Sequence, residues 1–297
     1  MPGLFMFGAG ASFGSDTSVT PPLGADLFDH LQRFNPDGWG TITGDLASSF
    51  REDFEEAIKR VNPAALGPLQ RAMAAYFFEF RPRTSNVYVS LARRIAQTRW
   101  DGAACTLNYE RLLEISLLAG GVQPVVGQAT EPGRTLELCL PHGCCHIFCD
   151  AARGAAGAVT FDAFAVSTNG PVTVVADPVQ HRHRILVDAF PPVMSYFEPQ
   201  KRTTAGASFI DGQRARWKHI ALAAEWIVVI GVKVRRHDDH MWGPLAATEA
   251  RIVYCGGPEG VSEYRSWVTS VGRRQNDLVL VGYFRDEFER ICFEAGL

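Results

Sequence analysis

Short, mostly apolar runs are the feature that most constrains the fold of this 297-residue chain. These runs are rich in Val, Ile, Leu and Phe, and they cover residues 3–7, 103–107, 136–140, 226–230, 251–255 and 278–281. Parallel strands that helices cover on both faces of a sheet have sequences of this kind. The runs therefore predict an α/β protein with a Rossmann-like parallel sheet and helices on both faces.

The patterns between these runs predict one domain, residues 1–297, with two insertions. The Rossmann-like core would consist of residues 1–44 and 98–297, with helices at 23–33, 112–118, 217–225 and 244–250. Residues 45–97 carry apolar side chains at helical spacing and no strand-like run, which predicts a helical insertion. Residues 150–200 are irregular and contain short β-rich pieces at 172–175 and 185–187, which predicts a loop and β insertion.

The composition narrows the class of protein. With 46% hydrophobic and 21% charged residues the chain is typical of a soluble globular domain. A formal net charge of −3 supplies no general attraction to nucleic acid, so we expect no direct nucleic-acid partner. No apolar run reaches the length of a membrane span and no signal peptide is recognisable, so we expect a cytoplasmic protein without membrane contact. Seven cysteines, an odd number mostly within apolar runs, favour reduced buried thiols over disulfides.

A glycine-rich turn follows the first apolar run. Gly8, Gly10 and Gly14 stand at a spacing one residue longer than the common dinucleotide-binding fingerprint. Glycine lets backbone N–H groups approach a pyrophosphate closely, and it also permits a tight turn with no ligand. The spacing alone leaves both interpretations open.

Asn108 and His142 each follow the end of a predicted strand. Ligands of open α/β sheets bind outside the carboxyl ends of the strands, so the amide and the imidazole are expected to face one cleft. An amide can orient water by hydrogen bonding, and an imidazole can act as a general base near neutral pH. The alternatives are that Asn108 only caps the following helix and that His142 is structural.

Four segments together resemble the sirtuin family of NAD-consuming deacylases and glycohydrolases. They are Gly8-Ala9-Gly10-Ala11-Ser12, Thr106-Leu107-Asn108-Tyr109-Glu110, His142-Gly143 and the strand that ends at Gly231. The resemblance covers most of the chain and is nearest to the bacterial branch that destroys NAD in antiphage defence. It implies that NAD is the substrate and that Asn108 and His142 are catalytic. It also implies NAD contacts for the residues that share the family's motifs, which are Gly8, Ala9, Gly10, Ser12, Thr106, Gly143 and Gly231.

Several positions depart from the sirtuin deacetylases. The chain has no C-x-x-C pair and therefore no zinc ribbon, and it lacks the Pro-Asp-Phe-Arg element and the peptide-binding Phe-Gly-Glu segment. Cys144, Cys145, His146 and Cys149 follow His142, but adjacent cysteines seldom bind one ion, so we expect buried apolar thiols and no metal. Lys233 replaces a family Ser and either approaches a phosphate or reaches solvent.

These features favour an NAD glycohydrolase that cleaves the nicotinamide–ribose bond. By resemblance it would be an antiphage-defence effector, activated as a homo-oligomer or by a partner such as a motor ATPase. One alternative is an NAD-dependent protein deacylase or ADP-ribosyltransferase, and another is a non-catalytic sensor of NAD or ADP-ribose. In the segment that follows Gly231, we expect Asp239 to cap a helix and Trp242 to lie in the core.

Overall fold

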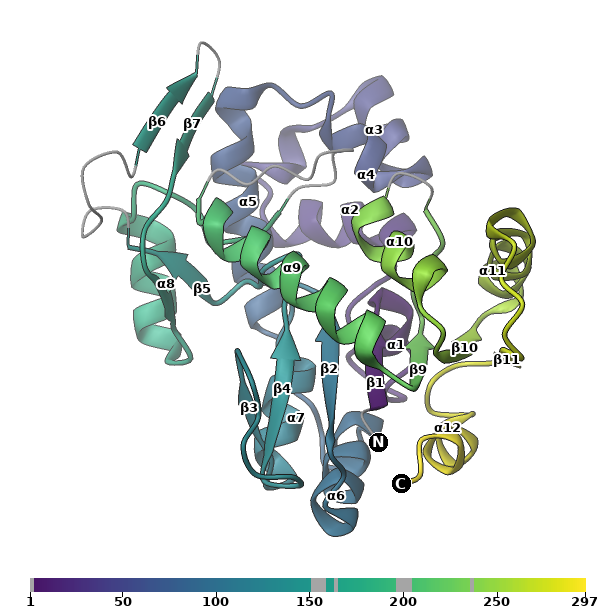
Figure 1. Ribbon diagram of the computed structural model, residues 1–297. Helices are drawn as coiled ribbons and strands as arrows, with labels where there is room; N and C mark the ends of the chain where they lie inside the picture. The colour runs from purple at the N-terminus through teal and green to yellow at the C-terminus, as the bar shows by residue number, and fades with distance from the viewer. Residues whose placement is uncertain (1–2, 151–158, 163–164, 196–204, 236–237) are drawn as a thin grey trace.

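The computed structural model describes residues 3–150, 159–162, 165–195, 205–235 and 238–297. Within these ranges a seven-stranded sheet forms in the order β11-β10-β9-β1-β2-β4-β3 (Figure 1). Its strands are β1 (Gly3–Phe7), β2 (Gly102–Thr106), β3 (Gln123–Val125), β4 (Thr135–Cys139), β9 (Trp226–Ile230), β10 (Arg251–Gly256) and β11 (Leu278–Val281). All neighbouring strands in this sheet are parallel, as the apolar runs predicted.

Helices cover both faces of the sheet because successive side chains of each strand point to opposite sides. In β1, Phe5 and Phe7 enter the core with α6 (Val87–Thr98), α7 (Leu112–Ala119) and α12 (Phe288–Glu294). Leu4 and Met6 enter the second core, with α9 (Ala207–Ala223), α10 (Asp239–Ala247) and α11 (Pro258–Val271). Figure 1 shows α9 and α10 in front of the sheet and α6 and α7 behind it. The predicted Rossmann-like architecture is confirmed.

A layer of helices lies above the carboxyl ends of the strands (Figure 1). It contains α2 (Gly24–Phe34), a 3₁₀ turn at Trp39–Thr41, α3 (Gly44–Glu52), α4 (Phe54–Ile58) and α5 (Pro63–Phe78). An aromatic core holds this layer together, with Trp39 fully buried and the rings of Phe28 and Phe50 stacked at 4.8 Å. The Gln70 side chain donates to the Met194 carbonyl at 3.0 Å, which ties α5 to the segment beside the sheet edge.

Smaller elements lie between β4 and α9. They are β5 (Ile147–Cys149), β6 (Val159–Asp162), β7 (Ala165–Thr168), β8 (Val172–Val174) and α8 (Pro178–Val187). The β-rich piece expected at 185–187 is wrong, because these residues form the last turn of α8. That helix starts with Pro178 in its first turn and with the Asp177 carboxylate accepting from the Gln180 N–H at 2.8 Å. Residues 151–158, 163–164 and 196–204 of the expected insertion lie outside the described residues.

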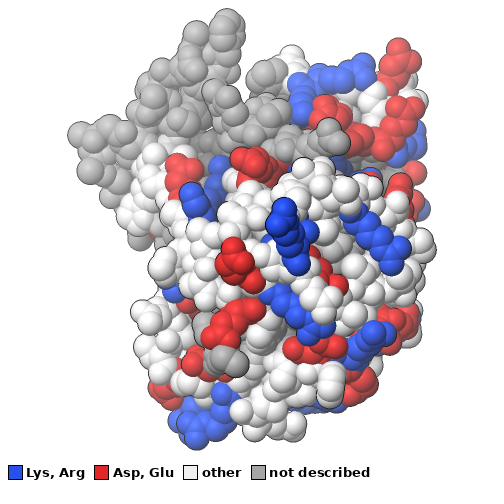
Figure 2. Space-filling model, turned by 45° about the vertical axis from the view of Figure 1, so that its right-hand side comes forward, with Lys and Arg blue, Asp and Glu red and all other residues white. Residues whose placement is uncertain are grey.

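Two expected helices have different limits. The helix expected at 217–225 is the second half of α9, which begins at Ala207, and the one expected at 244–250 is α10, which begins at Asp239 and ends at Ala247. None of the helices in the described ranges combines the length and apolar composition that a bilayer-spanning helix requires. Figure 2 shows acidic and basic side chains interspersed over one face of the molecule, with no broad region of a single sign.

The order of the strands defines the place for a ligand. From β1 the chain continues through β2, β3 and β4 on one side, and then returns to β9 on the other side of β1. The connections from β1 to β2 and from β9 to β10 therefore run toward opposite edges of the sheet. Crevices at such a switch point are where open α/β sheets bind ligands.

Candidate functional site

The glycine turn packs directly against the end of β9. The Gly10 N–H donates to the Gly231 carbonyl at 3.0 Å, and a Cβ on Gly10 would lie 2.9 Å from the Gly231 Cα. Gly231 itself has φ +61°, and a Cβ there would lie 2.1 Å from the Ala11 nitrogen. A side chain at either position would separate the two backbones, so these glycines bring the loops after β1 and β9 into contact.

Most amides of this turn already have acceptors. The N–H groups of Gly8 and Ala11 donate to the carbonyls of Ile230 and Gly8, both at 2.9 Å, and that of Gly10 is bonded to Gly231. Ala9 is exposed at the start of the short helix α1 (Ala9–Phe13). A phosphate would therefore meet the turn first at Ala9, and the NAD contacts inferred for these residues stay a prediction.

The Asn108 side chain reaches across to the glycine turn. Its amide nitrogen Nδ2 donates to the Gly8 carbonyl at 3.1 Å and to the Ser12 Oγ at 2.8 Å. The backbone N–H of Asn108 donates to the Thr106 Oγ1 at 3.2 Å. The N-cap of the following helix α7 is Arg111, so Asn108 does not cap it. Within the described ranges no donor bonds to the Asn108 Oδ1, and this oxygen keeps its capacity to accept.

Ser12 has its full complement of hydrogen bonds. Its hydroxyl donates to the Glu110 Oε1 at 2.6 Å and accepts from Asn108. Because the single Ser12 proton is already given to Glu110, the Tyr88 hydroxyl at 3.1 Å is the donor toward Ser12. In this conformation Ser12 holds the Asn108 amide in place, and its hydroxyl has no further capacity for a ligand.

Glu110 connects the same hydrogen-bond network to the start of α7. Its Oε2 accepts from the Leu112 N–H at 2.5 Å, which fixes the start of α7. Burial raises the pKa of the Glu110 carboxyl above its usual value, while the bonds from Ser12 and Leu112 favour its charged form. The sequence signal for this residue was its position in the Thr-x-Asn-x-Glu segment, but that pattern gave no indication of its two bonds.

The sheet register places Asn108 and His142 beyond the carboxyl ends of neighbouring strands. Cys105 of β2 pairs with Cys139 of β4, and Asn108 and His142 each follow three residues later. The His142 carbonyl accepts from the Ser195 N–H at 2.8 Å. Gly143 has φ +75° and packs so closely that a Cβ would lie 1.9 Å from the Val193 carbonyl oxygen. The 193–195 segment thus fixes the backbone of His142 at the edge of the sheet.

His240 is a second imidazole that the sequence interpretation missed. Its Nε2 lies 3.2 Å from the His142 Nε2, although the two residues are 98 positions apart in the chain. Two such nitrogens form a hydrogen bond only when one carries the proton. His240 belongs to the first turn of α10, and no local motif relates it to His142.

The remaining predictions near this segment have mixed outcomes. Trp242 is buried at 4% exposure, as expected. The N-cap of α10 is Asp238, not Asp239, and it makes no side-chain capping bond. Lys233 is exposed, and its ammonium lies 3.4 Å from the carboxylate of the half-buried Glu263.

A second buried polar cluster lies on the other side of the segment after β2. The Cys144 Sγ lies 3.1 Å from the Tyr109 carbonyl oxygen, 3.0 Å from the His146 Nδ1 and 3.7 Å from the Glu114 Oε1. Burial raises the pKa of Glu114 to about 7, and the neighbouring charge of Glu110 adds to this effect. Burial lowers the pKa of His146 to about 3, so this imidazole is neutral.

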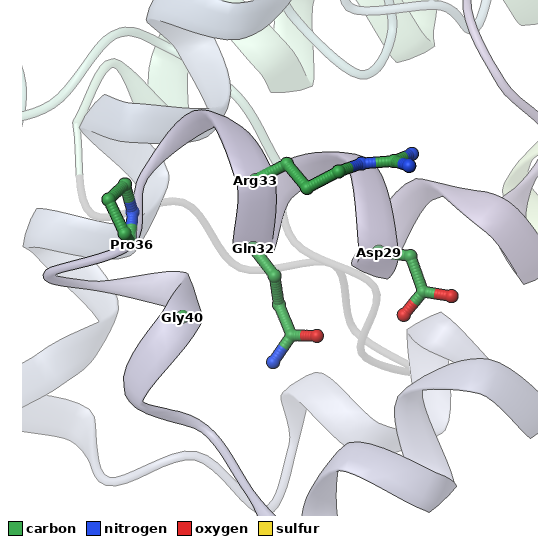
Figure 3. Close-up of a pocket in the computed structure, with 5 residues that line it drawn as sticks. All are labelled: Asp29, Gln32, Arg33, Pro36 and Gly40. Carbon is green, nitrogen blue, oxygen red and sulfur yellow. The ribbon is translucent and has the colours of Figure 1, made fainter.

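The site is closed in this conformation. Asn108 and His142 expose only 8% and 6% of their surfaces. A hollow of about 520 Å³ lies elsewhere, between α2 and the turn that follows it. Figure 3 shows the residues that line it, which are Asp29, Gln32, Arg33, Pro36 and Gly40. This hollow includes none of the predicted site residues.

Comparisons with known proteins give a similarity of fold. No family model and no curated protein matches this chain. Among the solved structures similar to it are two mutants of a Sir2 homologue, each described as a complex with ADP-ribose. In both cases the identity is 12%, the alignment covers 99% of this chain and 91% of the other, and the TM-score is 0.47. Similarity of this degree identifies no residue and no activity of the present protein.

Proposed function

We propose that this protein is an NAD glycohydrolase, which cleaves the bond between nicotinamide and ribose. The observation that carries the proposal is the position of Asn108 and His142, each three residues beyond the paired Cys105 and Cys139 on neighbouring parallel strands. This is the edge at which open parallel sheets bind their ligands. The sirtuin-like sequence segments contain both residues, which supports the proposal that NAD binds at this edge of the sheet.

The chemistry requires little beyond a placed water and a base. As the C1′–N bond breaks, its electron pair goes to the nicotinamide ring, which leaves neutral, and positive charge develops on the ribose. The Asn108 Oδ1 accepts from water or a ribose hydroxyl and places negative dipole near that charge. Water adds to C1′ and gives its proton to an imidazole nitrogen of His142. The products are nicotinamide, ADP-ribose and a proton.

Other residues act through these two. Ser12, Glu110 and Tyr88 are positioning residues, because their hydrogen bonds hold the Nδ2 side of the Asn108 amide. His240 shares a proton with His142 through the 3.2 Å contact between their Nε2 atoms. The pair can therefore take up a proton as one unit.

The closed conformation suits an enzyme that is held inactive. Side chains that are 8% and 6% exposed meet a dinucleotide only after neighbouring segments move. Oligomerisation or a partner such as a motor ATPase would supply the trigger, and antiphage defence would be the setting. The sequence resemblance supports this part of the proposal.

The test is nicotinamide release by purified protein incubated with NAD, with and without an acetylated-lysine peptide. Release that does not depend on the peptide, together with free ADP-ribose, is the expected result. Asn108→Ala should reduce the rate about 10²–10³-fold and His142→Ala about 10²–10⁴-fold. Asn276→Ala and His219→Ala, which change exposed residues, are the matched controls. Peptide-dependent turnover would instead identify a deacylase or transferase.

A further inference from the structure

The loop after β4 gathers three metal-binding side chains in the protein interior. Cys144 and Cys145 are fully buried and His146 is 6% exposed. Their ligand atoms all lie within 4.8 Å of one another. A thiol, a second thiol and a neutral imidazole are a donor set that soft or borderline ions such as zinc prefer, whereas Mg²⁺ and Ca²⁺ prefer oxygen ligands.

A fourth donor comes from a different element. Glu114 of α7 is 8% exposed, and its Oε1 lies 3.7 Å from the Cys144 Sγ. Its other oxygen, Oε2, is buried and has no hydrogen-bond partner within the described part of the chain. A buried carboxylate oxygen without a partner is costly, and buried polar atoms of this kind normally bind a donor or a cation.

We propose that Cys144, Cys145, His146 and Glu114 form a structural site for one zinc-class divalent ion. Bonds of about 2.0–2.3 Å in a tetrahedron place ligand atoms roughly 3.3–3.8 Å apart. The 3.0 Å between the Cys144 Sγ and the His146 Nδ1, and the 3.7 Å from Cys144 to Glu114, lie close to that range, whereas the ligand atoms of Cys144, Cys145 and His146 spread over as much as 4.8 Å. Binding would therefore draw the Glu114 carboxylate and the three side chains of the loop closer together.

The charges around the cluster are compatible with an ion. Two thiolates and one carboxylate carry three negative charges, of which the ion neutralises two. Arg111 interacts electrostatically with both Glu114 and His146, and it is itself 8% exposed. One buried guanidinium thus balances the remaining charge.

The position of the site indicates that a bound ion would stabilise the loops near Asn108 and His142. The Cys145 N–H donates to the Tyr109 carbonyl at 2.9 Å, so the cysteine loop adjoins the segment that carries Asn108, and it begins two residues after His142. An ion with four protein ligands has a closed coordination shell and contributes folding energy. It would fix the loops after β2 and β4 against one another, independently of any reaction at the sheet edge.

The sequence alone favours buried thiols here, because adjacent cysteines seldom bind one ion and no second ligand pair is present in the sequence. The fourth ligand lies thirty residues earlier, on a helix. Only the fold brings it to the cluster.

The test is the metal content of the full chain purified without chelator, measured by inductively coupled plasma mass spectrometry. We expect about one zinc ion per chain in the wild type and in Cys292→Ala, a control that removes a buried cysteine of α12. Cys145→Ala and Glu114→Gln should retain at least ~10-fold less zinc.

A second measurement keeps the test decisive if a variant fails to fold. Wild-type protein treated with chelator is titrated with Zn²⁺ alone, and its Tm should rise, because an ion that binds the folded state stabilises it. Co²⁺ added in place of Zn²⁺ should give the absorption of a tetrahedral thiolate site. Folded protein that contains no metal and shows no Tm change with Zn²⁺ would overturn the proposal. So would equal zinc in all variants, or a mass lower by two hydrogens that reveals a Cys144–Cys145 disulfide.

Discussion

Two buried polar clusters flank the segment after β2, and they differ in how completely their atoms are bonded. In the first, the Ser12 hydroxyl makes three hydrogen bonds and the Glu110 carboxylate accepts at both oxygens. In the second, the Glu114 Oε2 has no partner within the described ranges. A saturated network holds one side chain, Asn108, in a fixed orientation. An unsaturated cluster of ligands indicates that another group belongs there.

The largest loss of stability is expected where Gly231 packs against the glycine turn next to the first cluster. Gly231→Ala would combine left-handed backbone strain with a Cβ 2.1 Å from the Ala11 nitrogen, and it should lower the free energy of unfolding by about 3 kcal/mol or more. Urea denaturation followed by circular dichroism measures this loss.

Gly272→Ala is the matched control for this change. Gly272 also has positive φ, +68°, but a Cβ there meets nothing within 4 Å, so only the backbone strain of about 1–2 kcal/mol remains. Equal losses for the two variants would show that contact between the glycine turn and Gly231 does not hold the site together.

An intermediate loss of stability is expected when the buried glutamate of the first cluster is changed, and a smaller one or none when that of the second is changed. Glu110→Gln replaces an acceptor by an NH₂ group, so one of the bonds from Ser12 and Leu112 is lost, at a cost of about 1–3 kcal/mol in the free energy of unfolding. In protein freed of metal, Glu114→Gln should be neutral within about 0.5 kcal/mol or stabilising, because it removes a poorly bonded buried carboxylate.

Both variants are to be compared by urea denaturation at one pH, with Glu289→Gln as an exposed control. Glu289 pairs with Arg94 at the surface, where such a pair contributes about 0–1 kcal/mol. If Glu114→Gln costs as much as Glu110→Gln in the metal-free protein, the contrast between the clusters is wrong.

The smallest effect is expected at the imidazole pair. His240→Gln removes the contact with the His142 Nε2, a hydrogen bond worth about 1.4 kcal/mol, and should slow NAD cleavage about tenfold. The pH dependence of the rate should also shift, because the 3.2 Å contact between the two imidazoles is lost. His219→Gln, a change on the exposed side of α9, should leave both the rate and the pH profile unchanged. An unaltered pH profile in His240→Gln would assign His240 a merely structural role.

Most of the sheet was predictable because its inner strands are buried on both faces and therefore have mostly apolar sequences, whereas the partly exposed edge strand β3 was not predicted. The error at 185–187 has the same origin, since a three-residue apolar run does not distinguish a strand from the last turn of a helix such as α8. Asn108 and His142 were predictable as residues that follow strands.

Partners from distant elements were not predictable. His240 comes from α10 and Glu114 from α7, and no local spacing relates either residue to the group it approaches. The glycines of the turn were recognised, but their packing against Gly231 depends on β1 and β9 being neighbours, which only the strand order reveals.

The most direct test of the account is the NAD content of cells that express the wild type, Asn108→Ala or His142→Ala beside candidate activating partners. We expect NAD to fall and nicotinamide to rise with the wild type under an activating condition, and neither to change with either variant at equal expression. NAD depletion that persists in both variants would contradict the assignment of these two residues as the catalytic pair.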